Sequence, residues 1–336
     1  MATNPTYYTT ASAPFFPGAV ALLNSLRLSG NDGELVVIDA GLTREQRRAL
    51  VPHADVVDAP PAVRENPSLA KPFPYLLGDA GVAVVIDSDM IVTADLGPLV
   101  RPAVDGKLAL FPDHESARTR WFAEWQAALD LRARPRRQTY LNTGFVALDR
   151  ARWNDVLGRW WEGCARVAAA GAAAGPPETP FWARDQDVLN AILMSEVPAD
   201  SVAVLPAEAA VYWDRLRKVD VVDEHRLTCR LAGAPVAILH YSYRPKPWEA
   251  RAWPRVTNDA FLRLLPRVLF APDVELRLEP RALPLWARPG TPARLAVRLL
   301  DAAHFAAKTL VYAPAGPARR PLLALRNSLF ERAARS

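Results

Sequence analysis

Cysteine is scarce in this chain, whose 336 residues include only Cys164 and Cys229. The two do not have the spacing of a metal-binding motif, and they are too few for a disulfide framework, so a reduced cytoplasmic chain is expected. Long apolar runs are also missing, and no apolar segment reaches the length that a membrane-spanning helix needs. The first residues, MATNPTYYTT, have no basic segment followed by an apolar one, which argues against a secretory signal.

Charge is ordinary in amount but unevenly distributed. Hydrophobic residues make up 50% and charged residues 23%, which is typical of a globular protein large enough for one α/β domain with an appendage, or for two domains. Residues 251–336 contain 15 Lys+Arg and 6 Asp+Glu, whereas the whole chain has a net charge of +5. A basic tail on an acidic body indicates a surface that meets anions, although an arginine-rich composition alone would give the same count.

Short apolar runs alternate with helical patterns through the first two-thirds of the chain. Strands are expected at 6–10, 34–40, 54–59, 84–86, 107–112, 143–149, 202–205 and 236–240. Helices are expected at 19–26, from a capping box at Thr43 and Gln46, in part of 68–77, and at 121–129, 153–170 and 185–194. This alternation predicts an α/β fold with a mixed, mainly parallel sheet and helices on both faces.

The run VVIDSDMIV, residues 84–92, places two carboxylates where a buried strand ends. Residues i and i+2 of an extended chain point to the same side, so Asp87 and Asp89 are expected to present their carboxylates together. Two neighbouring carboxylates remain ionised if a cation lies between them, and oxygen ligands suit Mn²⁺ or Mg²⁺. Ligands of parallel sheets bind outside the carboxyl ends of the strands, where this pair lies.

A second motif, HYSYRPKPW at residues 240–248, closes the last expected strand. His240 can supply a third metal ligand as a neutral imidazole. Lys246 can place an ammonium group on phosphate oxygens, and the prolines on either side of it restrict the backbone. A strand that ends in Asp-x-Asp also occurs in haloacid-dehalogenase-type phosphatases. In those enzymes the motif opens the domain, whereas Asp87 follows several β/α units.

Taken together, these motifs resemble glycosyltransferase family 8, the retaining enzymes that include glycogenin and lipooligosaccharide galactosyltransferases. The resemblance covers about residues 5–250 and includes the segments DSD at 87–89, NTG at 142–144, DQ at 185–186 and the HYSYRPKPW closure. It implies a Rossmann-like GT-A catalytic domain over residues 1–250. It also implies transfer of a hexose from a nucleoside-diphosphate sugar, most often UDP-glucose or UDP-galactose, with Mn²⁺ or Mg²⁺ bound by Asp87, Asp89 and His240.

The resemblance also implies roles for further residues. Asp185 and Gln186 are expected beside the anomeric centre, and Lys246 on the diphosphate. The remaining donor contacts that it implies are Tyr8, Thr9, Thr10, Asp39, Lys71, Ser88, Asn142 and Tyr243. Tyr243 is a departure, because the family usually has glycine three residues after the histidine. A tyrosine there could stack on the donor, change donor choice or block the usual phosphate contact.

The reaction route and the acceptor stay open from sequence. Retention could come from front-face attack, which we favour, or from a covalent intermediate near Asp185 and Gln186. The acceptor could be a glycan, a lipid-linked sugar or another hydroxyl compound. The alternative to an enzyme is a catalytically silent sugar-nucleotide or glycan-binding protein, or a scaffold of polysaccharide assembly.

The C-terminal region, residues 251–336, is expected to be basic, rich in Pro and Arg, and partly helical. Residues 291–312 are amphipathic, with Leu295 and Leu299 on one side and Arg294 and Arg298 on another. Such a helix could pack on the body or on a partner, or lie at the inner face of the cell membrane, as the basic tails of bacterial family members do. Nucleic acid is not expected as a partner, because no base-stacking or groove-reading motif is present.

Overall fold

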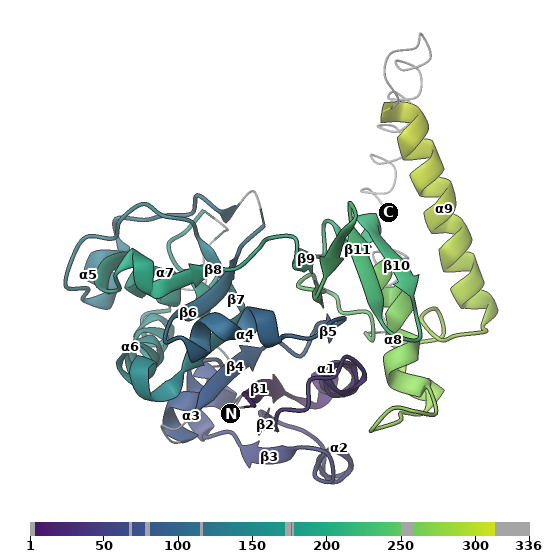
Figure 1. Cartoon of the computed structure of the whole chain (residues 1–336), viewed down its shortest axis with the longest axis horizontal. Helices are drawn as coiled ribbons and strands as arrows, with labels where there is room; N and C mark the ends of the chain where they lie inside the picture. Colours follow the sequence, from purple (N-terminus) through teal and green to yellow (C-terminus); the bar gives the residue numbers. More distant parts are fainter. Residues whose placement is uncertain are drawn as a thin grey trace.

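The computed structural model describes residues 4–66, 69–77, 81–114, 117–171, 176, 178–249 and 259–312. Within these residues, a central seven-stranded sheet runs in the order β3-β2-β1-β4-β7-β6-β8 (Figure 1). Its strands are β1 (Thr6–Ala11), β2 (Leu35–Asp39), β3 (Asp55–Asp58), β4 (Val82–Ile86), β6 (Leu108–Pro112), β7 (Leu141–Asp149) and β8 (Val202–Val204). The neighbours β1–β4, β1–β2, β2–β3 and β6–β8 are parallel, and only β7 runs antiparallel to its neighbours.

The sheet is buried on both faces because its strands contribute alternate residues to two separate cores. In β4, Val82, Val84 and Ile86 enter one core, whereas Ala83 and Val85 enter the other. This explains why the strand reads as a continuous apolar run rather than an alternating one. The predicted mixed, mainly parallel sheet is therefore confirmed, and so are helices on both faces.

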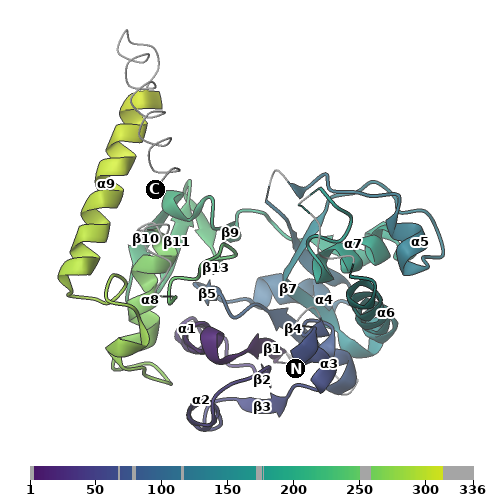
Figure 2. The same cartoon turned by 180° about the vertical axis from the view of Figure 1, so that it is seen from behind.

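Helices cover each face of the sheet (Figures 1 and 2). One face carries α1 (Phe16–Leu28), α2 (Arg44–Leu50) and α4 (Gly97–Val104), and the other carries α3 (Pro61–Glu65), α5 (Trp125–Leu129), α6 (Arg150–Ala169) and α7 (Asp185–Glu196). The expected capping box is present at α2, where Thr43 accepts from the Gln46 backbone and the Gln46 side chain accepts from the Thr43 N–H. Of the helix expected in part of 68–77, the structure shows a 3₁₀ helix at Phe73–Leu77, while Ser68 lies outside the described residues.

Two small sheets, which the sequence patterns did not predict as such, complete the first 250 residues. One has the order β5-β13-β9, from β5 (Met90–Val92), β13 (Ile238–His240) and β9 (Ala210–Tyr212). The other has the order β10-β11-β12, from β10 (Val219–Asp223), β11 (Thr228–Leu231) and β12 (Ala234–Val236). The strands of the first sheet are only three residues long, which is too short for a periodicity to be recognised. This sheet joins the Asp-x-Asp segment to the His240 segment.

The C-terminal region begins with a helix that belongs to the main core. Helix α8 (Ala260–Phe270) packs on α1, where the buried Asn24 donates to Val268 O at 2.6 Å and to Leu276 O at 2.8 Å. Helix α9 (Pro292–Tyr312) begins against α8, where Val297 is buried and Arg294 donates to Leu262 O at 3.3 Å, and its far end projects from the rest of the molecule (Figures 1 and 2). In the described part of the chain, no helix combines the length and the apolarity that crossing a bilayer requires.

Candidate active site

The two acids and the histidine that the sequence analysis singled out lie together. Asp87 directly follows β4, Asp89 directly precedes β5, and His240 ends β13, which pairs with β5 so that His240 lies opposite Met90. His240 Nε2 is 3.2 Å from Asp89 Oδ1 and 3.7 Å from Asp87 Oδ2. One potential ligand atom from each residue lies within 4.8 Å of the others. The main-chain pairing of two short strands thus brings together residues that are about 150 positions apart in the sequence.

The local geometry differs from the extended chain that we expected at this motif. Ser88 and Asp89 lie in a turn, and Met90 N–H donates to Asp87 O at 3.2 Å. The turn, and not a strand periodicity, therefore places both carboxylates toward His240. Gly18 of α1 allows this packing, because a Cβ at that position would lie 2.3 Å from Ser88 O and 2.6 Å from the Trp248 ring.

The donor atoms fit a divalent cation. Within the described residues, Asp89 Oδ1 is buried and makes no well-formed hydrogen bond, although His240 Nε2 faces it at 3.2 Å, and such an atom is costly unless something satisfies it. Two carboxylates and one imidazole form a ligand set that can hold a divalent cation. Gly144 leaves room beside them, because a Cβ there would lie 2.7 Å from His240 Cε1.

Two lysines neutralise the acids of the site. The buried Lys246 ammonium lies 2.5 Å from Asp89 Oδ2 and donates to Tyr241 O at 2.7 Å. Burial acts to raise the pKa of Asp89, but Lys246 and His240 outweigh it and hold that pKa well below its usual range. Lys71 lies 3.2 Å from Asp87 Oδ1 and 3.2 Å from Asp185 Oδ2. Burial opposes its charge, yet Asp185 and Asp87 raise the pKa of Lys71 above its ordinary value.

Asp87 is the less acidic member of the pair. Burial raises its pKa, and although Lys71 opposes this effect, the neighbouring Asp89 carboxylate adds to it. The two aspartates thus differ, because Asp89 contacts an imidazole and a fully buried ammonium, whereas Asp87 shares Lys71 with Asp185. Both lysines are residues that the resemblance implied as contacts of the donor.

A second group of polar side chains surrounds the start of α7. Asp185 Oδ2 accepts from Thr143 Oγ1 at 2.9 Å, and Gln186 Oε1 accepts from Thr143 N at 3.1 Å. Gln186 Nε2 donates to Asp113 Oδ2 at 2.8 Å, and Asn142 Nδ2 donates to Asp113 Oδ1 at 3.2 Å. The predicted residues of β7 and α7 are therefore adjacent, and Asp113 joins them.

A buried ion pair supports the same helix. Asp187, which is completely buried, accepts from Arg120 Nε at 2.5 Å and from the Tyr140 hydroxyl at 2.8 Å. Its other oxygen accepts from Ala183 N at 2.7 Å. Because Ala183 lies in the turn before Asp185, this contact fixes how α7 begins. Arg184 in the same turn has a φ of 48°, which is unusual for a residue with a side chain.

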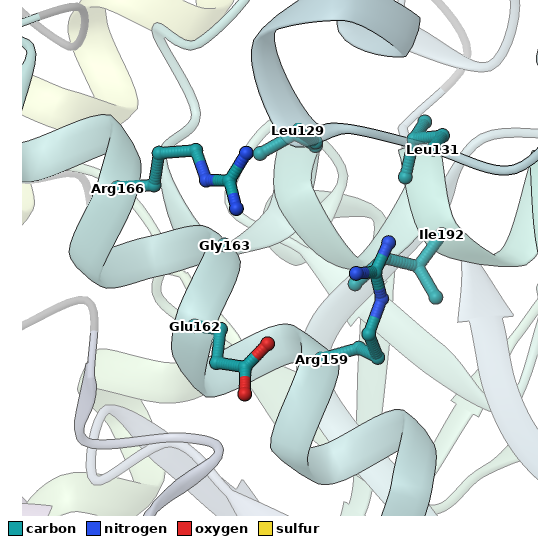
Figure 3. Close-up of a pocket in the computed structure, with 7 residues that line it drawn as sticks. All are labelled: Leu129, Leu131, Arg159, Glu162, Gly163, Arg166 and Ile192. Carbon is teal, nitrogen blue, oxygen red and sulfur yellow. The ribbon is translucent and has the colours of Figure 1, made fainter.

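The metal-ligand group, the two lysines, Asn142, Asp185 and Gln186 line one cavity of about 720 Å³, which is within the usual range for small-molecule sites. Five cationic side chains line it, more than the three aspartates. The cations are Arg64, Lys71, Arg184, Arg244 and Lys246. An excess of cations suits an anionic ligand larger than a metal ion. A second hollow between α5, α6 and α7 has a volume of only about 10 Å³, room for about one water molecule (Figure 3).

Most of the predicted donor contacts line the cavity. Tyr8, Thr9, Thr10, Lys71, Ser88, Asn142, Asp185 and Gln186 do so. Thr9 Oγ1 is buried and has no hydrogen-bond partner among the described residues. The Tyr8 hydroxyl, in contrast, already accepts from Arg150 at 2.8 Å.

Two predicted contacts lie elsewhere. Asp39 is not among the cavity-lining residues, and its carboxylate accepts from Gly41 N at 2.9 Å, Leu42 N at 2.7 Å and Arg47 at 2.8 Å. It therefore stabilises the loop after β2. Tyr243 does not line the cavity either, since its ring packs against Trp213 with centroids 5.0 Å apart.

Some residues of the site had not been singled out from sequence. Asp113 follows β6 directly, so the rule that led to Asp87, polar groups at strand ends, could have found it too. Trp182 and Arg184 line the cavity from an irregular turn. No periodicity or spacing marks such a turn, so only the structure could place these two residues.

No model of a protein family matches this sequence, and no curated protein matches it either. Solved structures do match the fold. The galactosyltransferase LgtC, in complex with donor and acceptor sugar analogues, is similar with a TM-score of 0.54 and 17% identity, over 80% of this chain and 98% of LgtC. The apo structure of the bifunctional glycosyltransferase WbbM gives a TM-score of 0.52 at 17% identity, over 88% of this chain and 51% of WbbM.

This chain has the GT-A glycosyltransferase fold. At such identities the similarity shows the fold, which agrees with the predicted fold class. It does not single out family 8. The phosphatase alternative loses its support, because Asp87 follows the fourth strand of a GT-A sheet and does not open the domain.

Proposed function

We propose that this chain is a metal-dependent, retaining glycosyltransferase that moves a hexose from a nucleoside-diphosphate sugar to an acceptor hydroxyl. UDP-glucose and UDP-galactose are the donors we favour. The observation that carries the proposal is the convergence of Asp87, Asp89 and His240 at one edge of a cavity whose other charged residues are mostly cationic. Carboxylates can bind a divalent cation, and the surrounding cationic side chains can bind the diphosphate that such a cation accompanies.

Asp87, Asp89 and His240 would hold Mn²⁺ or Mg²⁺, which supplies Lewis-acid neutralisation of charge on the departing diphosphate. Lys71 and Lys246 already lie at the two aspartates and add fixed positive charge in a largely buried site, where it is worth more than in water. Thr9, with its unpartnered buried hydroxyl, is the strongest candidate among the β1 residues for a contact with the nucleoside. Tyr8, Thr10, Ser88 and Asn142 complete the proposed donor contacts.

The hydrogen bonds of Asp185 and Gln186 favour front-face attack. The Asp185 carboxylate is held by the Thr143 hydroxyl and by Lys71, and the Gln186 amide is held between Thr143 and Asp113. Groups held in this way position a substrate better than they attack it. In the front-face route the bond from the anomeric carbon to the phosphate oxygen breaks. The acceptor oxygen bonds to the same face, and its proton passes to the leaving phosphate.

The acceptor is proposed to be a glycan or a lipid-linked sugar. Contact of residues 291–336 with the inner face of a membrane remains part of this proposal. On α9, Leu295, Leu299 and Leu300 are exposed, and a basic, amphipathic helix of this kind can bind an anionic surface. Residues 313–336 lie outside the described residues. The silent sugar-nucleotide-binding protein is the second candidate, and turnover distinguishes it.

The test is a thermal-shift panel of UDP, UDP-glucose and UDP-galactose, each with and without Mn²⁺, followed by measurement of released UDP. Ligands that bind the folded state raise the melting temperature, and we expect the largest rise with nucleotide and Mn²⁺ together. UDP release supports an enzyme, whereas metal-dependent binding without release supports the silent protein. The absence of any nucleotide effect would contradict both.

Asp89→Asn is the informative variant. Truncation to Ala would leave the buried Lys246 ammonium without its partner, a change that commonly costs about 3–5 kcal/mol and would confuse folding with function. Asn keeps an acceptor for Lys246 but removes the charge. We expect Asp89→Asn to lose the Mn²⁺-dependent shift and turnover, and Asp220→Ala, at an exposed position of β10, to keep both.

A further inference from the structure

Two aromatic side chains beside the active site face solvent as a pair. The rings of Trp213 and Tyr243 have centroids 5.0 Å apart and an interplanar angle of 33°. Trp213 is 44% exposed and Tyr243 is 37% exposed. Large aromatic side chains normally bury most of their surface, so a partly stacked pair that stays open to solvent indicates a binding surface.

The strand pairing places this pair next to the metal-ligand group. Tyr212 ends β9 and lies opposite His240, which ends the parallel strand β13. Trp213 is one residue beyond the first strand end and Tyr243 is three beyond the second. Since a chain advances at most about 3.5 Å per residue, Tyr243 lies within roughly 10 Å of His240 along the backbone.

The pair lies next to the cavity, and neither ring is among the side chains that line it. Ser242 and Arg244, the neighbours of Tyr243 in sequence, do line the cavity, and the Arg244 guanidinium lies 5.2 Å from the Phe15 ring centroid. Tyr243 therefore points away from the proposed diphosphate position and toward Trp213. A tyrosine in place of the expected glycine leaves the phosphate region free and builds an aromatic surface outside it.

We propose that Trp213 and Tyr243 form the acceptor platform, on which a pyranose ring of the acceptor glycan stacks. This inference rests on the proposed transferase function and names the acceptor class for the same site. One face of a pyranose presents C–H groups, which pack on aromatic rings, while its hydroxyls stay at the edge for hydrogen bonds. A donor inside the cavity and a sugar on the adjoining platform would place an acceptor hydroxyl at the cavity entrance.

The position of the platform suits the acceptor sugar and not the nucleotide of the donor. The cationic residues and the unpartnered Thr9 hydroxyl lie in the cavity, so the donor has its charged and polar contacts there. Neither ring of the platform lines that cavity. An uncharged surface of two aromatic rings offers little to a diphosphate and much to the apolar face of a sugar.

The test uses the full chain with UDP and Mn²⁺ and measures saturation-transfer NMR signals of methyl β-D-galactopyranoside, methyl β-D-glucopyranoside and lactose. We expect Trp213→Ala and Tyr243→Ala each to weaken sugar binding about two- to tenfold, the range that aromatic contacts contribute. Trp213→Phe and Tyr243→Phe keep a ring and should retain most of the signal. Val222→Ala removes an apolar side chain that is 60% exposed on β10 and should change nothing.

The stabilisation by UDP and Mn²⁺ is measured on every variant. An unchanged value in Trp213→Ala, with weakened sugar binding, supports the platform. Three results would each overturn the inference. Sugar binding could be unchanged in Trp213→Ala, or the wild-type chain could bind UDP and Mn²⁺ without any sugar signal. The third result is that Trp213→Ala also loses the binding of UDP and Mn²⁺. If the wild-type chain binds the sugars through these rings but does not bind UDP, the rings are a sugar-binding surface, while the transferase proposal and the acceptor role fail.

Discussion

Gly144 offers a direct test of how tightly the active site is packed. It lies in β7, beside the metal-ligand group, and donates its N–H to Asn142 Oδ1 at 2.8 Å. A Cβ at this position would lie 2.6 Å from Met90 Cε, 2.7 Å from His240 Cε1 and 2.8 Å from Asn142 Oδ1. Real side chains do not approach so closely, so Gly144→Ala forces at least one of these groups to move.

The size of the effect can be estimated from opposing contributions. Overpacking of a dense core costs about 1–3 kcal/mol, while replacing glycine stiffens the unfolded chain and returns about 0.4–1 kcal/mol. At the midpoints of these ranges we expect Gly144→Ala to lower the free energy of unfolding by about 1.3 kcal/mol, a fall of about 2–5 °C in melting temperature for a chain of this size. The displacement falls on His240, so metal binding should weaken as well.

The assay measures the melting temperature with and without Mn²⁺ and UDP. A ligand at 100 times its Kd adds about 2.7 kcal/mol, and if the Kd rises tenfold the gain at the same concentration falls to about 1.4 kcal/mol. Gly97→Ala is the control, because its Cβ would meet only the exposed Asp95 carboxylate, at 3.2 Å. A Gly144→Ala variant with wild-type stability and an unchanged ligand-dependent gain would refute the close packing described above.

Two further predictions concern buried carboxylates, Asp187 behind α7 and Asp39 at the end of β2. Arg120→Met leaves the fully buried Asp187 carboxylate without its cation and should cost about 3–5 kcal/mol in urea unfolding, with part of the loss recovered in a double variant that also carries Asp187→Asn. Burial acts to raise the pKa of Asp39, but the N–H groups of its loop and Arg47 outweigh it and hold that pKa below 3.8. Its stabilising effect is therefore complete above pH 3.8 and lost as the pH falls through the folded-state pKa. Urea unfolding at pH 5 and pH 3 should show the difference between wild type and Asp39→Asn shrinking at the lower pH, and a constant difference would contradict this.

The central elements could be predicted from sequence because their signals are local. The apolar run before Asp87 is long enough to be a strand buried on both faces, and the Thr43–Gln46 pair marks a helix start through bonds within four residues. The helix from Asp185 was likewise recognisable from its period and its acidic first turn. Each of these signals depends on neighbours in the chain and needs no knowledge of tertiary contacts.

The finer geometry of the site depended on contacts that no local pattern encodes. Asp39 is the last residue of β2 and Tyr243 comes three residues after β13, yet Arg47 holds the first at its loop and Trp213 packs against the second. The sequence places a side chain at a strand end. Which way that side chain then points is decided by partners from other elements.

By itself, the sequence determined the strands and main helices of the central sheet, the layered α/β architecture and the residue types available for metal and phosphate chemistry, because hydrophobic period and chain-local hydrogen bonding are sufficient for these. Only the tertiary structure decided that Asp89 and His240 meet, through the pairing of β5 with β13, and that Lys246 neutralises Asp89 in the interior. Burial turns such proximity into strong electrostatic interaction, and burial is a property of the packed chain and not of any one segment.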